Sequence, residues 1–213
     1  TSASAARASA AESIRSRFVI STGDNFYTTG VSSTDDPKWL RSYEEIYTAR
    51  SLWEPWYVVL GNHDWQGNPY AQIAYSRISP RWRMPDTYFT ASFRLDDDST
   101  DVLIVFMDTT PLADFERADI YPMSNRWNQR AQLQWMDSTL AHSKAEWKIV
   151  VGHHPVFSGG SHGNTPILTK KLQPLFEKYG VDAYFNGHDH ALEHVVKDGV
   201  NYFTVGAGAG GSP

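Results

Sequence analysis

Short apolar runs recur along the chain, and polar residues follow several of them at once. Runs of this kind occupy residues 18–20, 56–60, 147–151 and 181–185. Their length and their content of β-branched and aromatic residues predict buried strands. Segments with helical spacing of apolar residues lie between these runs. The pattern therefore predicts a fold in which strands and helices alternate.

The helical segments are recognised by apolar residues three or four positions apart. Leu133, Met136 and Leu140 show this spacing. Good helix formers and prolines at favourable first positions support the other segments. Helices are expected at residues 3–17, 37–50, 69–78, 128–143 and 165–179.

Further strands are expected in two pairs, at residues 87–94 and 101–107 and near residues 193–197 and 200–205. The acidic turn Asp96–Thr100 joins the first pair, and we interpret it as a solvated hairpin tip rather than as a cation site. Hairpins within an alternating pattern favour an α/β fold with a mixed sheet or two stacked sheets, covered by helices on both sides.

Length and composition suit one folded domain over residues 1–213. Hydrophobic residues make up 41% and charged residues 20% of the chain, an ordinary globular balance. The net charge of -5 and the lack of a basic run argue against a nucleic-acid partner. No apolar stretch reaches the ~20 residues of a membrane span. The Ala/Ser-rich first segment lacks the apolar core of a secretory signal, and we interpret it as a helix of the domain, with a transit peptide as the alternative.

Polar clusters with metal-ligand residue types follow four of the predicted strands. They are Gly23-Asp24-Asn25-Phe26-Tyr27, Gly61-Asn62-His63-Asp64, Gly152-His153-His154-Pro155 and Gly187-His188-Asp189-His190. Residues beyond the carboxyl ends of strands can converge at one edge of an α/β sheet. The glycine in each cluster lets the backbone turn sharply or approach an ion closely. The sequence thus predicts that the four clusters meet at one site.

The donor atoms in these clusters indicate the kind of site. A carboxylate, a phenol, an amide and several imidazoles supply oxygen and nitrogen, which suit iron, zinc or manganese. Since the chain has no cysteine, a thiolate site is excluded. The donors are too many for one closed tetrahedral site, and the carboxylate of Asp24 can bridge two cations.

We interpret His142 and His194, outside the clusters, as surface or core residues. The tryptophans Trp39, Trp53, Trp56, Trp127 and Trp135 are expected in the core.

The motifs GDNFY, GNHD, GHHP and GHDH together resemble those of the calcineurin-like metallophosphoesterases. Tyr27, in a GDxxY pattern, narrows the resemblance to the purple acid phosphatases, and the tartrate-resistant, single-domain branch is the most similar. The resemblance runs over essentially the whole chain. It implies a four-layer αββα fold, in which mixed sheets form a sandwich with helices on both sides.

The resemblance also implies a role for each cluster residue. Tyr27 and His190 would bind iron(III), and Asp24 would bridge it to a divalent cation (iron, zinc or manganese). The other ligands implied for the divalent cation are Asn62, His153 and His188.

Two histidines are implied in catalysis. His63 matches a substrate-binding histidine, and His162, nine residues after His153, matches a histidine that protonates the leaving group. The remaining polar residues are interpreted as groups that support the ligands or contact the substrate: Asn25, Asp64, His154 and Asp189. His154 takes a place often held by tyrosine in this branch. For Asp64 and Asp189 a plain turn role is the alternative.

One ligand of the family pattern has no counterpart in the chain. The family carries a further Asp on a first strand, before the first helix, but no Asp precedes Asp24. The family domain also continues past Pro213. We therefore expect this chain to be a fragment that lacks the first strand and the C-terminal part.

The predicted function is hydrolysis of small phosphate monoesters at acidic pH by a dinuclear Fe(III)–M(II) centre. Two alternatives stay open: a phosphodiesterase or nucleotide pyrophosphatase with the same core, and a non-catalytic metal- or phosphate-binding module. The resemblance also suggests a secreted or lysosomal/vacuolar location, and we favour a monomer.

Overall fold

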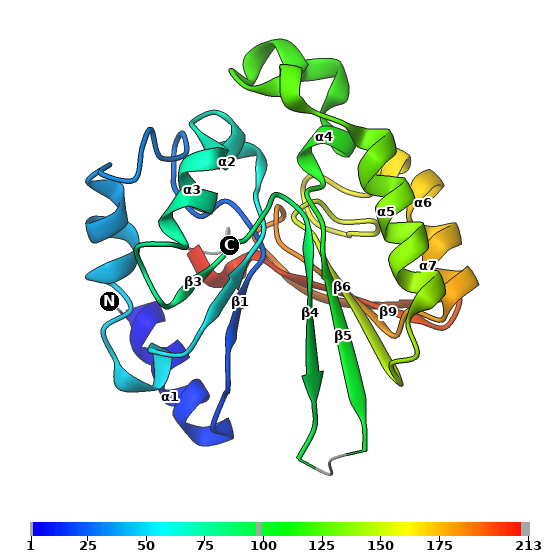
Figure 1. Cartoon of the computed structure of the whole chain (residues 1–213), viewed down its shortest axis with the longest axis horizontal. Coiled ribbons are helices and arrows are strands. Elements are labelled where there is room, and N and C mark those ends of the chain that lie inside the picture. Colours follow the sequence, from blue (N-terminus) through cyan, green and yellow to red (C-terminus); the bar gives the residue numbers. More distant parts are fainter. Residues whose placement is uncertain (1, 97–98, 210–213) are drawn as a thin grey trace.

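The computed structural model describes residues 2–96 and 99–209, and its strands form two sheets (Figure 1). The smaller sheet has three strands in the order β1-β2-β3, and the larger has six in the order β4-β5-β6-β7-β9-β8. Mixed strand directions and two stacked sheets agree with the sequence prediction.

The three-stranded sheet is parallel throughout. Its strands are β1 (Val19–Ser21), β2 (Trp56–Val58) and β3 (Trp82–Arg83). Because β1 and β2 run in the same direction, both end at the same edge of the sheet, and the clusters that follow them begin there.

The six-stranded sheet is mixed. Its strands are β4 (Phe89–Arg94), β5 (Asp101–Phe106), β6 (Trp147–Val151), β7 (Ala183–Asn186), β8 (Leu192–Lys197) and β9 (Val200–Val205). The inner strands β5, β6, β7 and β9 are parallel, and the outer strands β4 and β8 are antiparallel to their neighbours. The loops after β6 and β7 therefore leave the sheet at one edge.

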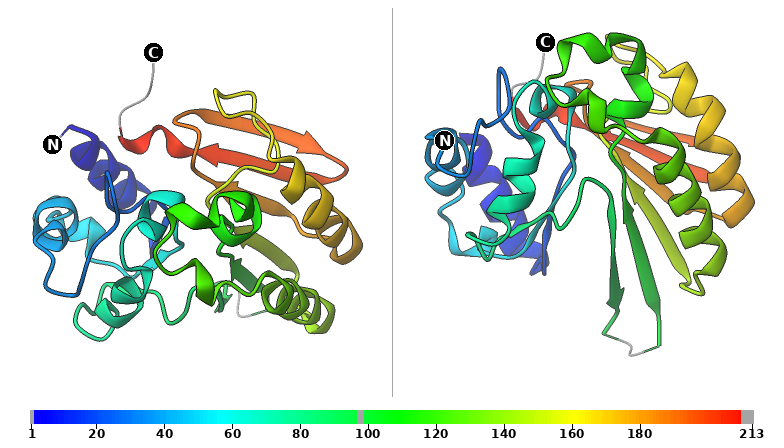
Figure 2. Two further views of the ribbon diagram at one scale, coloured as in Figure 1. Left: turned by 90° about the horizontal axis from the view of Figure 1, so that it is seen from above. Right: turned by 45° about the horizontal axis from the view of Figure 1, so that its top comes forward.

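Helices cover the outer sides of the two sheets, as Figures 1 and 2 show. The helices are α1 (Ser2–Ile14), α2 (Asn62–Trp65), α3 (Pro69–Tyr75), α4 (Thr110–Ala113), α5 (Gln129–His142), α6 (Pro166–Lys171) and α7 (Gln173–Tyr179). Helices α5, α6 and α7 pack on the six-stranded sheet, whereas α1 and α3 lie beside the three-stranded sheet. The predicted four-layer arrangement is confirmed.

Two apolar cores hold these layers together. The core between the sheets includes Val58, Phe106 and Val151. The core between the large sheet and its helices includes Val105 and Met136. Burying one such side chain contributes ~1.5–3 kcal/mol relative to leaving it exposed. Packing therefore fixes how the two sheets face each other, and with it the distance between the polar clusters.

Some elements differ from the prediction. Instead of one helix at residues 37–50, the chain forms a π-helical turn, η1 (Leu40–Glu44), and a 3-10 turn, η2 (Arg50–Leu52). The helix expected at residues 165–179 is divided into α6 and α7. Pro174 sits in the first turn of α7, where its missing N–H is tolerated. Inside one continuous helix, the same proline would remove a hydrogen bond and clash with the preceding turn.

Two smaller expectations fail or fall outside the structure. Trp53 is 62% exposed rather than part of the core; its indole N–H donates to the carbonyl of Thr48. In the acidic turn, residues 97–98 lie outside the described residues, and Asp96 forms an ion pair of 2.9 Å with Arg17.

In the described part of the chain, no helix has the length and apolar character that crossing a bilayer requires.

Further 3-10 turns complete the fold: η3 (Phe115–Ile120), η4 (Ser124–Arg126) and η5 (Gly206–Ala209). The last of these lies beside α1 (Figure 2, left), where Arg7 donates a hydrogen bond to the carbonyl of Gly208. The first and last described segments are thus neighbours.

Candidate metal centre

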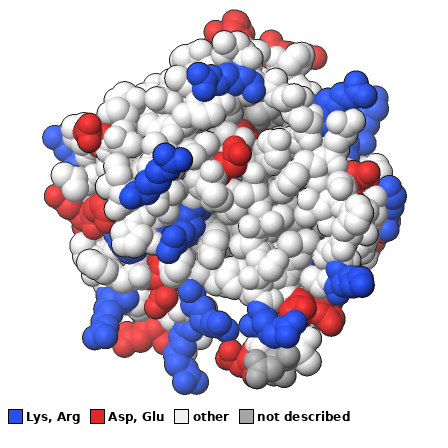
Figure 3. All heavy atoms as spheres, in the orientation of Figure 1, with Lys and Arg blue, Asp and Glu red and all other residues white. Residues whose placement is uncertain are grey.

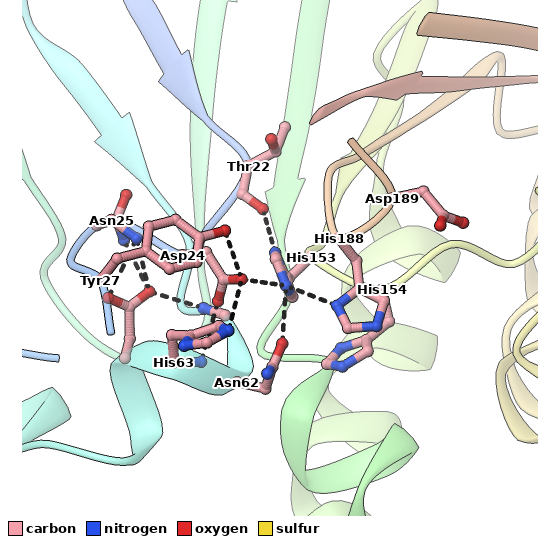
Figure 4. Close-up of polar contacts among 12 residues, drawn as sticks. Thr22, Asp24, Asn25, Tyr27, Asn62, His63, His153, His154, His188 and Asp189 are labelled. Carbon is pink, nitrogen blue, oxygen red and sulfur yellow. Dashed lines mark hydrogen bonds and ion pairs between the residues drawn. The ribbon is translucent and has the colours of Figure 1, made fainter. Parts of the chain in front are cut away.

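The four polar clusters meet where the ends of β1, β2, β6 and β7 come together (Figure 4). Each of the six residues expected as ligands contacts at least one other member of the set. These residues are Asp24, Tyr27, Asn62, His153, His188 and His190. The predicted convergence of segments far apart in the sequence is therefore present in the fold.

His153 is at the middle of this group. Its Nδ1 lies 2.8 Å from the carbonyl oxygen of Thr22, so Nδ1 carries a proton and donates it. Its Nε2 faces Asn62 Oδ1 at 3.1 Å and His188 Nδ1 at 3.1 Å. The carboxylate oxygen Oδ2 of Asp24 lies 3.4 Å from the same nitrogen. The lone pair of His153 Nε2 therefore points into a group of other electron-rich atoms.

Such a group is stable when a positive charge lies among its atoms. Burial lowers the pKa of His153, but the neighbouring carboxylate of Asp24 more than offsets this effect, and the pKa is raised. The site therefore attracts either a proton or a cation. Imidazole nitrogen, amide oxygen and carboxylate oxygen are suitable ligands for zinc, iron or manganese. The residues present fit a metal cation.

Asp24 directs its two carboxylate oxygens at different neighbours. Its backbone φ is +54°, in the left-handed region, directly after β1. Its Oδ1 accepts the backbone N–H of His63 at 3.0 Å, and its Oδ2 accepts the hydroxyl of Tyr27 at 3.0 Å. Burial would raise the pKa of Asp24, but His153 and His63 hold it well below its usual range. The side chain is thus an anion between the two halves of the site.

The position of Asp24 depends on the absence of a side chain at Gly61. A Cβ atom there would lie 2.1 Å from Asp24 Oδ1 and 2.4 Å from the Asp24 backbone nitrogen. These separations are too short for any non-bonded contact, so a close approach of two backbone segments requires the glycine of the GNHD cluster.

Tyr27 and His190 form the second half of the site. The hydroxyl of Tyr27 lies 3.2 Å from His190 Nε2. Burial and the charge of Asp24 raise the pKa of Tyr27 above its usual value. A cation close to the phenol would counter this shift, because positive charge stabilises the phenolate.

The two histidines expected in catalysis flank the ligands on opposite halves of the site. His63 places its ring 4.6 Å from the ring of Tyr27, with Nε2 4.0 Å from Asp24 Oδ2. The ring of His162 lies 4.3 Å from that of His188. The side chain of His162 is 56% exposed, so it is open to solvent and to an incoming molecule.

Asp189 contacts both the backbone and the ring of His162. Its Oδ1 lies 2.8 Å from His162 Nδ1 and accepts the backbone N–H of the same residue at 2.9 Å. Its Oδ2 accepts the hydroxyl of Ser158 at 2.6 Å. Burial raises the pKa of Asp189, but these hydrogen bonds outweigh it and lower the pKa. Asp189 is therefore ionised and accepts a hydrogen bond from the Nδ1–H of His162.

Asp64 supports the backbone instead of an imidazole. Its carboxylate accepts the N–H of Gly61 at 2.9 Å, the side-chain amide of Gln72 at 2.8 Å and both amides of Asn25. Burial and the charge of Asp24 raise the pKa of Asp64 to about 6. Asp64 and Asn25 thus link the loops after β1 and β2, which is the turn role kept as the alternative for Asp64.

His154 is buried beside the candidate ligands His153 and His188. One of its ring nitrogens lies within 4.8 Å of ring nitrogens of His153 and His188. Its Nδ1 contacts Thr109 Oγ1 at 3.0 Å. Burial, followed by the nearby imidazoles of His153 and His188, lowers the pKa of His154 well below its usual value. His154 is therefore a neutral imidazole.

Sequence reasoning missed Asp108 and Thr109, which follow β5 at the same edge. Both side chains are buried. Asp108 accepts the indole N–H of Trp65 at 3.0 Å, and burial raises its pKa well above the usual value. The signal was present, because an apolar run ends there in Asp108-Thr109-Thr110, but the segment has no glycine and no histidine.

A cavity of about 400 Å³ adjoins the site. It is lined by ligand residues such as Asp24 and His190, by the segment Val19–Thr22 and by Arg7. Since β1 pairs only with β2 among the described strands, its other edge faces this cavity.

Comparisons with known proteins agree with this geometry. The sequence profile of the calcineurin-like phosphoesterases matches residues 6–192. Tartrate-resistant acid phosphatase type 5 is 43% identical in Oryctolagus cuniculus and 40% in Homo sapiens, each over 90% of this chain and 61% of the relative. Purple acid phosphatase 3 of Arabidopsis thaliana is 41% identical over 90% of this chain and 54% of the relative. The chain thus spans less than two thirds of these relatives, and the predicted resemblance is confirmed.

Solved structures share the fold. The GAP50 protein, described as the anchor in the inner membrane complex of Plasmodium, superposes with a TM-score of 0.83 at 27% identity, over 97% of this chain and 66% of that chain. Purple acid phosphatase PPD1 of yellow lupin has a TM-score of 0.63 at 17% identity, over 93% of this chain and 38% of that chain.

Proposed function

Because this chain belongs to the calcineurin-like phosphoesterase family, we propose that it forms the core of a dinuclear metallohydrolase that cleaves phosphate monoesters at acidic pH. One observation carries the proposal: six candidate ligands from four separate loops contact one another at the ends of β1, β2, β6 and β7. The names of the acid phosphatases among the relatives support this substrate class.

We propose two cation positions that share Asp24. Tyr27 and His190 would hold iron(III), whose charge is needed to ionise a phenol with a raised pKa. The ligands for a divalent iron, zinc or manganese ion would be Asn62, His153 and His188. When bound, the two cations would supply Lewis-acid activation of water and of the phosphoryl group, and a trivalent charge would extend this activation to lower pH.

The histidines of this chain then act on the substrate. His63 lies beside Tyr27 and Asp24, and in its protonated form it donates a hydrogen bond to a phosphate oxygen. The Nδ1–H of His162 donates a hydrogen bond to Asp189. With Nδ1 protonated, a further proton on Nε2 makes the ring an imidazolium. That proton can pass to the leaving-group oxygen, and this requirement favours activity at acidic pH.

The substrate class is tested with 4-nitrophenyl phosphate and bis(4-nitrophenyl) phosphate on the protein loaded with iron and zinc. We expect faster hydrolysis of the monoester and higher rates at pH 5 than at pH 8. Faster hydrolysis of the diester would support the phosphodiesterase alternative, which uses the same ligands. No hydrolysis of either ester, with metals bound, would reject the enzymatic proposal.

A non-catalytic module is the second candidate, favoured by the likeness to GAP50, which is described as an anchor. The presence of both His63 and His162 beside the ligands speaks against it, because a binding module does not need a group that protonates a leaving group. Metal analysis together with the phosphatase assay separates the two candidates: metal or phosphate binding without turnover supports the module.

The cellular location is proposed from the relatives alone. We propose a secreted or lysosomal/vacuolar protein that acts on a small phosphorylated molecule as a monomer. Fractionation of cells that produce the natural protein tests the location, and recovery in the cytosol alone would contradict it.

On the face shown in Figure 3, Lys and Arg are scattered among acidic residues instead of forming one strip. This distribution does not favour a polyanion as substrate.

A further inference from the structure

The hydroxyl of Thr109 lies at a junction between β5 and the loop that carries two imidazoles. Thr109 is fully buried directly after β5. Its Oγ1 accepts the backbone N–H of His153 at 3.1 Å and that of His154 at 2.9 Å. A hydroxyl has two lone pairs and one proton. Both lone pairs are occupied, so the proton is donated to the remaining neighbour, His154 Nδ1, at 3.0 Å.

This donation fixes the tautomer of His154. Since Nδ1 accepts a hydrogen bond, the ring proton is on Nε2, and Nε2 is a buried atom without a partner among the described residues. An unsatisfied buried N–H is unfavourable. A phenyl ring would avoid it, so packing alone does not explain an imidazole here. What the imidazole supplies is an acceptor for the proton of Thr109, which in turn lets Thr109 hold the backbone of the loop.

The fixed ring of His154 also lies against a candidate ligand. Its centroid is 4.5 Å from that of His188. His188 has a φ of +60°, in the left-handed region that residues with a side chain rarely adopt. Its Nδ1 nevertheless faces His153 Nε2 at 3.1 Å. The surrounding side chains must therefore hold His188 in this position, and His154 is one of them.

We propose that Thr109 and His154 form a support that positions the imidazoles of His153 and His188 for the divalent cation. Thr109 acts on His153 through the backbone N–H, and His154 acts on His188 through its ring. Both are positioning residues, since their side chains are buried and act through other groups. The proposal rests on the proposed function, because it concerns the ligands of the same centre.

The test compares zinc affinity of the metal-free protein and its variants by competition with a chromogenic chelator. Thr109→Val has nearly the same shape but no hydroxyl, and we expect zinc to bind roughly 10–100-fold more weakly, as is usual when a group that orients a ligand is lost. Thr109→Ser keeps the hydroxyl and should bind within about twofold of the wild type. Thr169→Val is the matched control, because Thr169 donates to the carbonyl of Val156 within the fold.

A second variant tests the connection between the two residues. His154→Phe keeps a ring beside His188 but removes the acceptor for Thr109, so zinc affinity should fall. If the two residues act as one unit, the effects are not additive. The double variant Thr109→Val/His154→Phe should then bind zinc no more weakly than Thr109→Val alone. Additive losses would contradict the proposed support.

Two readouts separate positioning from a merely structural role. The visible absorption spectrum of bound Co²⁺ reports ligand geometry, and thermal unfolding of the metal-free protein reports stability. If Thr109→Val lowers the melting temperature but leaves zinc affinity and the cobalt spectrum unchanged, the inference is overturned and the proposed function stands. A wild-type protein that binds neither zinc nor cobalt would overturn the proposed function itself, and the inference with it.

Discussion

Nε2 of His153 lies 3.4 Å from Oδ2 of Asp24, although these residues follow strands in different sheets. Asp24 follows β1 of the three-stranded sheet, and His153 follows β6 of the six-stranded sheet. The contact exists only when the apolar core between the sheets is packed. Metal binding and folding are therefore linked, and a bound cation should stabilise the sandwich.

Replacement of His162 tests its role as the general acid. His162→Ala should lower kcat by roughly 10²–10⁴-fold, the usual contribution of such a group, with metal content unchanged. Turnover of 4-nitrophenyl phosphate and metal analysis of the same sample give the two measurements. His142→Ala, at the exposed end of α5, is the control. Unchanged turnover in His162→Ala would remove this assignment.

Replacement of Gly61 tests the close approach to Asp24. A methyl group in Gly61→Ala would collide with the Asp24 carboxylate and displace it from both proposed cations. We expect loss of at least one metal ion per chain, measured by atomic emission. Gly159→Ala is a milder change, because its nearest neighbour is the mobile end of the Glu193 side chain. Full metal content in Gly61→Ala would show that Asp24 does not bridge.

Replacement of Tyr27 tests the assignment of the iron(III) position. A phenolate bound to iron(III) gives a charge-transfer band in the visible range. Tyr27→Phe should lose this band, while zinc binding to the imidazole and amide ligands around His153 should weaken by less than the roughly 10–100-fold that is usual when a group orienting a ligand is lost, because none of the described hydrogen bonds of Tyr27 goes to these ligands. A visible band of unchanged intensity in Tyr27→Phe would assign the colour to another residue.

Asp137 should make stability depend on pH. Its carboxylate accepts the hydroxyl of Tyr179 at 2.7 Å and the ammonium of Lys178 at 3.1 Å, joining α5 to α7. These two hydrogen bonds lower its pKa in the folded chain. The hydrogen-bonded carboxylate therefore stabilises the fold fully above pH 3.8, the usual pKa that Asp137 has in the unfolded chain. This contribution is lost as the pH falls through the lower pKa that Asp137 has in the folded chain.

The comparison of wild type with Asp137→Asn measures this effect. The melting temperatures of the metal-free proteins should differ by less than roughly 4 °C at pH 6, because the pair is exposed. The difference should shrink as the pH falls below ~4. A difference that grows under acidic conditions would mean that the sign of the pKa shift is wrong.

Much of the site could be predicted because its signal is local. Each of the four clusters combines a strand pattern with glycine and a ligand type within a few residues, as in the segment Gly187–His190. The parallel arrangement of β6 and β7 then brings the clusters to one edge. The exact ends of β6 and the start of α5 were also predictable, since apolar spacing and the Asn128 cap determine them locally.

The remaining features depend on tertiary packing. Thr109 has an ordinary sequence environment, and its role comes from a contact with residues 44 or 45 positions away. Trp53 is exposed and lies over the guanidinium of Arg81, which is 5.1 Å from the indole centroid. The strand β3 has only two residues, too short for a periodic pattern. None of these features is encoded by spacing along the chain.

The most direct test is a crystal structure of the protein soaked with zinc, with anomalous difference maps at the zinc edge. We expect a peak among Asp24, Asn62, His153 and His188, at the usual zinc–nitrogen distance of ~2.0–2.1 Å from His153 Nε2. Zinc bound elsewhere on the molecule, with these four side chains free of metal, would contradict it.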